Sequence, residues 1–190
     1  MDGVRFIPRR RAQVGAETII LPLQWASMFT SGEVQLSGAT VPAIPTYDTA
    51  VNAYPLCTSQ VGAGTSADVW WTIAVLPTTY LAAIDLTLSI DGIYVLGGDA
   101  VLVAATIDLE AFPYDSTNGD FSNADVCATA AQALGVAFAT EAFTLTGTNF
   151  TAGQPVLLRF TSSIEITSVG GAGTGQNGFN FPRLSYSGKI

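Results

Sequence analysis

Four of the seven basic residues lie within the stretch RFIPRRR at 5–11, close to the N-terminus. They are Arg5, Arg9, Arg10 and Arg11. A guanidinium group donates paired hydrogen bonds to a carboxylate or a phosphate, so this stretch predicts recognition of an anionic partner. Phe6, Ile7 and Pro8 add apolar contact area among the charges, and the proline favours an extended backbone before it. We therefore expect a docking arm, with a disordered basic tail as the alternative.

The remainder of the chain is acidic. Beyond residue 11 it carries three basic and fourteen acidic side chains, a net charge of −11, and the whole chain has a formal net charge of −8. Such a body repels phosphate, so nucleic acid is not expected as a partner. A protein surface that presents carboxylates is the partner that the arm predicts.

The residue types that most often perform catalysis are scarce. Histidine, the commonest general base and the commonest metal ligand, does not occur in the chain. The fifteen acidic residues show no recognisable pair of the kind that flanks a sugar in a glycosidase. We therefore expect a protein that is not an enzyme and that has no cofactor and no metal site.

Two short motifs resemble binding loops. GTGQNG at 173–178 has the spacing of a dinucleotide-binding loop, but strand-like sequence follows it where that loop needs a helix, so we expect a flexible loop. DSTNGD at 115–120 offers Asp115, Asn118 and Asp120 to calcium, but it lacks the alternate-residue spacing of a calcium loop. We expect a solvated turn there.

The cysteines and tryptophans each allow two interpretations. Cys57 and Cys127 are expected to be packed thiols, with one disulfide between them as the alternative. Trp25, Trp70 and Trp71 are large enough to stack on a sugar ring. Because neighbours in a strand point to opposite faces, at least one of Trp70 and Trp71 is expected in the core, and core or interface packing is the simpler role.

Composition sets the class of protein. The 190 residues suit one domain, and only 12% are charged, against about 25% in an ordinary soluble domain. So few charges on a chain that is 48% hydrophobic predict a surface covered by a partner, and closed symmetry then predicts a homotrimer. Gly, Pro and Asn break the uncharged stretches, so we expect no membrane span and no membrane partner.

Short runs rich in Val, Ile, Thr and aromatic residues alternate with turn residues. In IDLTLSI at 84–90 apolar and polar residues alternate strictly, and IDLEAF at 107–112 repeats the pattern, with Asp108, Glu110 and Phe112 on the second face. The expected strands are 17–23, 68–76, 84–96, 100–112, 136–146, 154–162, 164–169 and 181–190. This count predicts an all-β antiparallel β-sandwich, jelly-roll-like, with an extended N-terminal arm at 1–16 and a single domain at 17–190.

Two segments do not fit this pattern. Residues 122–135 are rich in alanine, begin with cap residues and end at a glycine, which favours a short helix, although a strand is the alternative. Residues 38–65 have few charges and predict a long irregular stretch.

Three stretches, DVWWTIAVLPTTYLAAIDLTLSI at 68–90, GQPVLLRFTSS at 153–163 and FPRLSYSGKI at 181–190, carry a resemblance. Together they resemble a loose family of small β-sandwich structural proteins of tailed bacteriophages and prophages. In that family a strand with tryptophan leads through a proline-containing turn into an alternating strand. Ser162 and Ser163 stand where such proteins often have an arginine, and residues 1–65 have no obvious counterpart.

The resemblance implies a structural virion protein and no catalysis. The role that we expect is a cement or decoration protein on the capsid surface, bound to the major capsid protein and trimeric. A tail-fibre or receptor-binding module that recognises host glycan is the alternative. The resemblance also favours a strand over a helix for residues 125–131.

Overall fold

The structure is a computed structural model that describes residues 14–20, 24–25, 29–30, 33–34, 56–82 and 84–189. Its strands are β1 (Val14–Ile20), β2 (Gln24–Trp25), β3 (Phe29–Thr30), β4 (Glu33–Val34), β5 (Leu56–Val61), β6 (Gly64–Val75), β7 (Leu86–Gly97), β8 (Ala100–Asp115), β9 (Asp120–Phe121), β10 (Gln132–Ala133), β11 (Ala139–Leu145), β12 (Pro155–Ser168), β13 (Thr174–Phe179) and β14 (Arg183–Lys189). Among the described residues the single helical piece is the 3-10 turn η1 (Gly147–Asn149), and no helix there is long and apolar enough to span a membrane. The predicted all-β class is confirmed.

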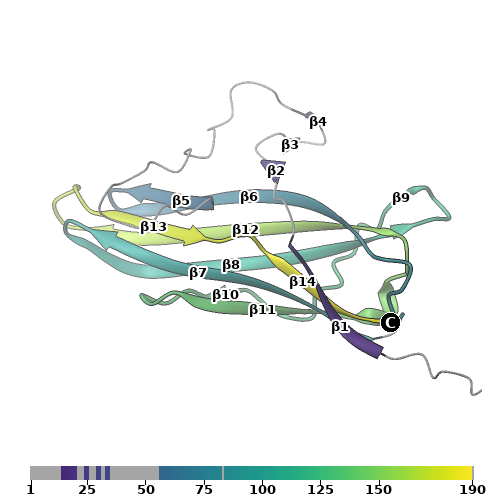
Figure 1. The fold of residues 1–190 in the computed structure, drawn as a ribbon. Helices are drawn as coiled ribbons and strands as arrows, with labels where there is room; N and C mark the ends of the chain where they lie inside the picture. The colour runs from purple at the N-terminus through teal and green to yellow at the C-terminus, as the bar shows by residue number, and fades with distance from the viewer. Residues whose placement is uncertain are drawn as a thin grey trace, which may run out of the picture.

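The strands form two antiparallel sheets that face each other (Figure 1). The first sheet contains β5, β13, β7 and β11 side by side, and β14 and β1 extend it next to β7. The second contains β6, β12, β8 and β10, with β2 on the outer edge of β6. From β5 to β13 these eight strands alternate between the two sheets, except that β10 lies in the same sheet as β8, the strand before it in this set. β13 lies between β5 and β7, and β12 lies between β6 and β8, which is the strand order of a jelly roll.

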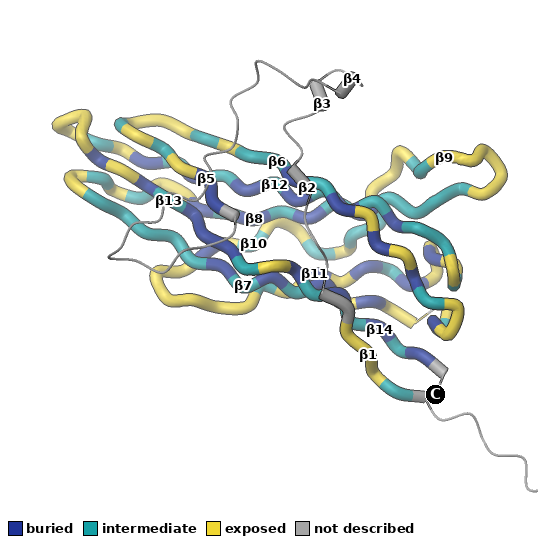
Figure 2. The backbone as a smooth tube through the Cα atoms, turned by 45° about the horizontal axis from the view of Figure 1, so that its top comes forward, coloured by how far each residue is buried: buried dark blue, intermediate teal, exposed yellow. Residues whose placement is uncertain are grey.

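Alternation along the central strand β12 builds the core. Its even-numbered residues from Val156 to Ile166 are all buried, while the odd-numbered ones are partly exposed. The same period of two places Trp70, at 1% exposure, against the inner face of β13, where it meets Phe179 edge to face with ring centroids 5.8 Å apart. Figure 2 shows the buried positions along the middle of the strands and the exposed ones concentrated in the loops.

GTGQNG forms a strand, so the expectation of a flexible loop at 173–178 is wrong. β13 begins at Thr174 and pairs with β5 on one side and β7 on the other. Gly175 is required there because a Cβ at this position would lie 2.8 Å from Ile166 of the facing sheet. A central position between two strands thus outweighs the low strand propensity of glycine.

Of the two conformations left open for residues 122–135, the short helix is wrong and the segment is extended, in line with what the resemblance implied for residues 125–131. Cys127 forms an isolated antiparallel bridge with Leu145, and Gln132 and Ala133 form β10 beside β8. The carboxylate of Asp125 accepts hydrogen bonds from the backbone N–H groups of Ala111 and Cys127, at 2.8 and 2.9 Å. Hydrogen bonds to strands of both sheets decide the conformation, against the local alanine-rich signal.

Two boundaries also differ from the sequence prediction. The expected strands 154–162 and 164–169 are one strand, β12, with an irregularity in its pairing to β8 between Glu165 and Ile166. β5 and the first residues of β6 lie within the stretch 38–65 that was expected to be irregular.

Cys57 and Cys127 form no disulfide, as expected.

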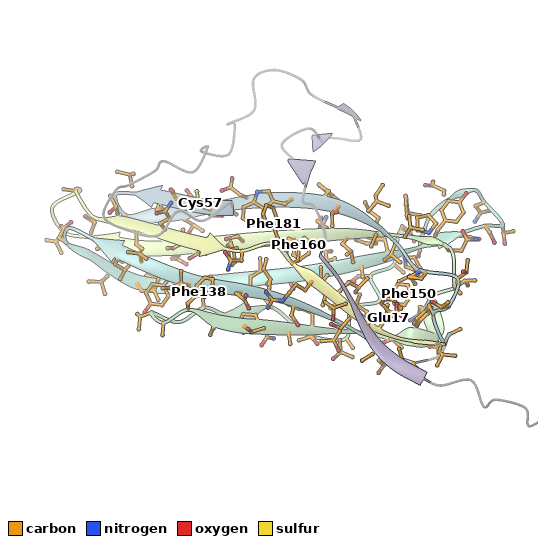
Figure 3. All side chains as sticks on the ribbon, viewed as in Figure 1. Glu17, Cys57, Phe138, Phe150, Phe160 and Phe181 are labelled. Atoms are coloured by element: carbon orange, nitrogen blue, oxygen red, sulfur yellow. The ribbon has the colours of Figure 1, made fainter. Side chains whose placement is uncertain are left out.

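Replacing Phe160 by alanine tests the sandwich core, since its side chain is completely buried between the sheets (Figure 3). Phe160→Ala should lower the free energy of unfolding by about 3–5 kcal/mol. The control Phe181→Ala removes a ring that is 48% exposed and should cost less than about 1 kcal/mol. Urea unfolding measures both, and equal losses would contradict the described core.

Candidate functional site

The residues of the predicted docking arm, Arg5, Phe6, Ile7, Arg9, Arg10 and Arg11, lie outside the described residues. The first described element is β1, which begins at Val14 within the range expected for the arm. β1 pairs along its whole length with β14, from Val14 opposite Lys189 to Ile20 opposite Arg183. β1 therefore begins beside Lys189, at the edge of the first sheet.

Side-chain hydrogen bonds also connect β1 to β14. The hydroxyls of Thr18 and Ser185 lie 3.1 Å apart, and the phenol of Tyr186 donates a hydrogen bond to the carboxylate of Glu17. That hydrogen bond, with a contribution from burial, raises the pKa of Tyr186 to about 12. The strand that follows the arm is thus part of the folded sandwich.

An ion pair joins β14 to β7 on the outer face of the first sheet. The two terminal nitrogens of Arg183 each donate a hydrogen bond of 2.6 Å to one carboxylate oxygen of Asp91. The hydroxyl of Thr140 on β11 donates a third bond to Asp91, at 2.5 Å. The bonds from Arg183 are the main reason why the pKa of Asp91 lies below its ordinary value; partial burial opposes them and Thr140 adds to them.

The second arginine of the sandwich lies on the outer face of the second sheet. Arg159 forms an ion pair with Glu110 on β8, which is opposite it in the register. Its guanidinium carbon lies 5.5 Å from the ring centroid of Trp71 and 6.0 Å from that of Phe112. The two rings are 6.2 Å apart and inclined by 31°. Arg159 therefore contacts both aromatic rings and is also paired with Glu110.

These four residues belong to a larger surface, which we call the aromatic face. Leu157 lies between Phe112 and Ile73 in the strand register, and Ile73 and Val75 are 54% and 61% exposed. On the other side of Arg159, the next outward residue of β12 is Thr161, opposite Asp108. The aromatic face thus changes from apolar to polar along the strands, with Arg159 at the boundary.

The sequence located only part of the aromatic face. The alternation in IDLEAF correctly placed Glu110 and Phe112 on an outward face, and one tryptophan of the adjacent pair, Trp70, is in the core as expected. Arg159 carried no signal, because its role depends on the register that sets it between β6 and β8.

The turn at 115–120 closes a hairpin between β8 and β9. The carboxylate of Asp115 accepts hydrogen bonds from the backbone N–H of Thr117, at 2.8 Å, and from the amide of Asn118, at 2.6 Å. The N–H of Thr117 is the chief cause of the lowered pKa of Asp115. Within the described ranges, no three His, Cys, Asp or Glu side chains are grouped so that they could hold a metal ion.

Comparison with known proteins gives no family. No family model matches the chain, and no curated protein matches it. Among solved structures, the CBM22-1 xylan-binding domain of Paenibacillus barcinonensis Xyn10C is 12% identical, with 70% of this chain and 86% of that one covered and a TM-score of 0.32. TmCBM61 in complex with beta-1,4-galactotriose is 11% identical, with coverage of 79% and 80% and a TM-score of 0.33. An apo-form cyclase from Fischerella sp. is 14% identical, with coverage of 91% and 98% and a TM-score of 0.37.

Structural similarities with such low TM-scores and sequence identities give no basis for an argument about function. The class of fold, an antiparallel β-sandwich, follows from the strand order itself.

The pair of Asp91 and Arg183 predicts how stability depends on acid. Because the pKa of Asp91 is lower in the folded chain than in the unfolded one, its contribution is present above about pH 4 and is lost as the pH falls through the folded value. Urea unfolding should show a steep loss of stability below about pH 4 in the wild type and a shallower one in Asp91→Asn. Arg183→Gln should also make the loss of stability below about pH 4 shallower. The double variant should depend on pH little differently from either single variant. An unchanged slope in Asp91→Asn would exclude the pair as the source.

Proposed function

We propose that this protein is a non-enzymatic structural protein of a tailed bacteriophage, a cement or decoration protein that binds the outer surface of the capsid. The resemblance of residues 68–90, 153–163 and 181–190 to small phage β-sandwich proteins supports the class. Its partner is the major capsid protein, it acts as a homotrimer, and nucleic acid plays no part.

The distribution of positive charge is the observation that carries this proposal. Arg159 and Arg183 are the only arginines beyond residue 11, and both are neutralised within the sandwich, by Glu110 and Asp91. The arginines of the arm are therefore the one concentrated source of positive charge on an acidic chain. An acidic capsid surface attracts this segment and repels the rest, which orients the protein on the particle.

The strand that follows the arm, β1, suits this role. β1 pairs with β14 at seven positions, so a force on the arm acts on the edge of the first sheet. The aromatic face lies on the other sheet, and its exposed Ile73 and Val75 remain available for contacts between subunits of the homotrimer.

Deleting residues 1–11 tests attachment by the arm. The truncated protein should keep its melting temperature and its sedimentation coefficient, because β1 and the sandwich are retained, and should no longer co-sediment with particles that lack the native protein. A matched variant with Arg5, Arg9, Arg10 and Arg11 all replaced by Gln keeps the apolar anchors. It should bind weakly and with reduced dependence on salt.

Decoration by the truncated protein as tight as by the full chain, at moderate salt, would place attachment on the sandwich instead. A concentration-independent monomer in sedimentation would count against the homotrimer.

Glycan recognition is the second candidate function, and the aromatic face favours it. Trp71 and Phe112 offer apolar rings, and Glu110, Asp108 and Thr161 offer hydrogen-bonding groups along the same outward surface. Stacking on aromatic rings combined with hydrogen bonds to hydroxyls is the usual chemistry of sugar binding. In this role the protein is a receptor-binding module of the tail.

Trp71→Ala distinguishes the two functions. If the aromatic face binds host glycan, the variant should lose at least tenfold in affinity on a glycan array or in affinity electrophoresis, while Phe181→Ala should bind as the wild type does. Decoration of capsids should survive Trp71→Ala if the arm attaches the protein. Retention of a wild-type glycan affinity by Trp71→Ala would eliminate the aromatic face as a glycan site.

A further inference from the structure

Four polar residues form a closed ring between the two sheets. Asp68 on β6 is opposite Ser162 on β12 in the second sheet, and Thr58 on β5 is opposite Asn177 on β13 in the first. The side-chain amide of Asn177 donates a hydrogen bond of 3.1 Å to the hydroxyl of Ser162. The hydroxyl of Thr58 lies near the carboxyl of Asp68 and favours its ionised form. Each member therefore neighbours two others, and two come from each sheet.

The ring lies in the interior and leaves two oxygen atoms without partners. Thr58, Ser162 and Asn177 have no exposed surface, and Asp68 is intermediate in exposure. The amide nitrogen of Asn177 also donates to the carbonyl of Ser163, at 2.8 Å. Because a carbonyl can only accept, this bond identifies the nitrogen of the amide and leaves its oxygen, Oδ1, for another partner. Among the described residues, neither this oxygen nor Oγ1 of Thr58 has a hydrogen-bond partner in good geometry.

The carboxyl of Asp68 has no described cationic partner. Arg159 and Arg183 form their ion pairs on the outer faces of the two sheets, with Glu110 and Asp91. Burial is the main reason why the pKa of Asp68 is raised, and the neighbouring hydroxyl of Thr58 only partly offsets it. A desolvated carboxylate beside two unpartnered oxygens makes this part of the interior costly unless a positive group completes it.

We propose that the ring binds a hard cation between the sheets, with oxygen ligands from Thr58, Asp68, Ser162 and Asn177. All four donors are oxygens, which alkali and alkaline-earth cations prefer, and none is a sulfur or imidazole ligand suited to zinc or copper. One carboxylate balances one positive charge, so the charge count favours Na⁺ over Ca²⁺, and Asp68 is the one ligand of the four with exposed surface. This site is independent of the proposed virion function and departs from the sequence prediction of no metal.

The site has a structural consequence. Its ligands lie on the two strand pairs β5–β13 and β6–β12, so a bound cation ties an edge of the first sheet to the second. The sequence offers no signal for this, because residues 58, 68, 162 and 177 form no motif and meet only through the jelly-roll topology.

Thermal unfolding at constant ionic strength tests the proposal on the full-length protein. Tetramethylammonium chloride, whose cation is too large for the ring, is exchanged stepwise for NaCl or, in a second series, for CaCl₂. The melting temperature of the wild type should rise and saturate with one of these ions, as expected for a ligand that binds only the folded state. Asp115→Asn, which changes an exposed carboxylate with its own hydrogen bonds, should show the same rise.

Two isosteric variants separate a cation site from a merely structural cluster. In tetramethylammonium alone, Asp68→Asn should melt no lower than the wild type, because it removes a desolvated charge. In saturating Na⁺ or Ca²⁺ the wild type should melt higher than Asp68→Asn, so the order of stability reverses, and Thr58→Val, which lacks one ligand, should gain less from the ion than the wild type does. No rise in the wild type, or an equal rise in Asp68→Asn, would overturn the proposal and leave buried water as the occupant of the ring.

Discussion

The pairing of β12 with β6 on one side and β8 on the other is the constraint on which the rest of this structure depends. β12 pairs with β6 along twelve consecutive residues and with β8 over almost its whole length, so a shift of one position would turn Phe160 outward and Arg159 into the core. The same register sets Trp71, Arg159 and Glu110 in one row on the outside and Asp68 beside Ser162 on the inside. Core, aromatic face and polar ring are thus consequences of one alignment.

The two arginines of the sandwich illustrate how an acidic protein uses its few positive charges. Each is paired with a carboxylate on a neighbouring strand, and each pair fixes strands that are distant in sequence: β14 to β7 and β12 to β8. Neither arginine is left to attract a ligand by charge alone.

The periodicity of the sequence correctly predicted which face of a single strand is buried. It failed where neighbouring strands determine the conformation of a segment. The alternation in residues 84–90 and 107–112 gave the correct faces, because it reports one buried side of one strand. The glycines of 173–178 suggested a loop, since nothing local shows that β5 and β7 lie on either side of them or that Ile166 leaves no room for a Cβ. The alanine-rich segment at 122–135 suggested a helix, since the hydrogen bonds that extend it come from Ala111 and from β11. Arg159 and the ring around Asp68 required the complete topology.

The placement of β1 makes the two ends of the sandwich different. Val14 and Lys189 lie opposite each other beside the beginning of β7, whereas the loop at 169–173 follows the end of β12, beside the far end of β7 (Figure 1). Val169 in that loop is fully exposed. A peptide inserted there would project from the end of the sandwich opposite Val14 and Lys189. The loop is therefore the natural position for inserting a foreign peptide into this sandwich.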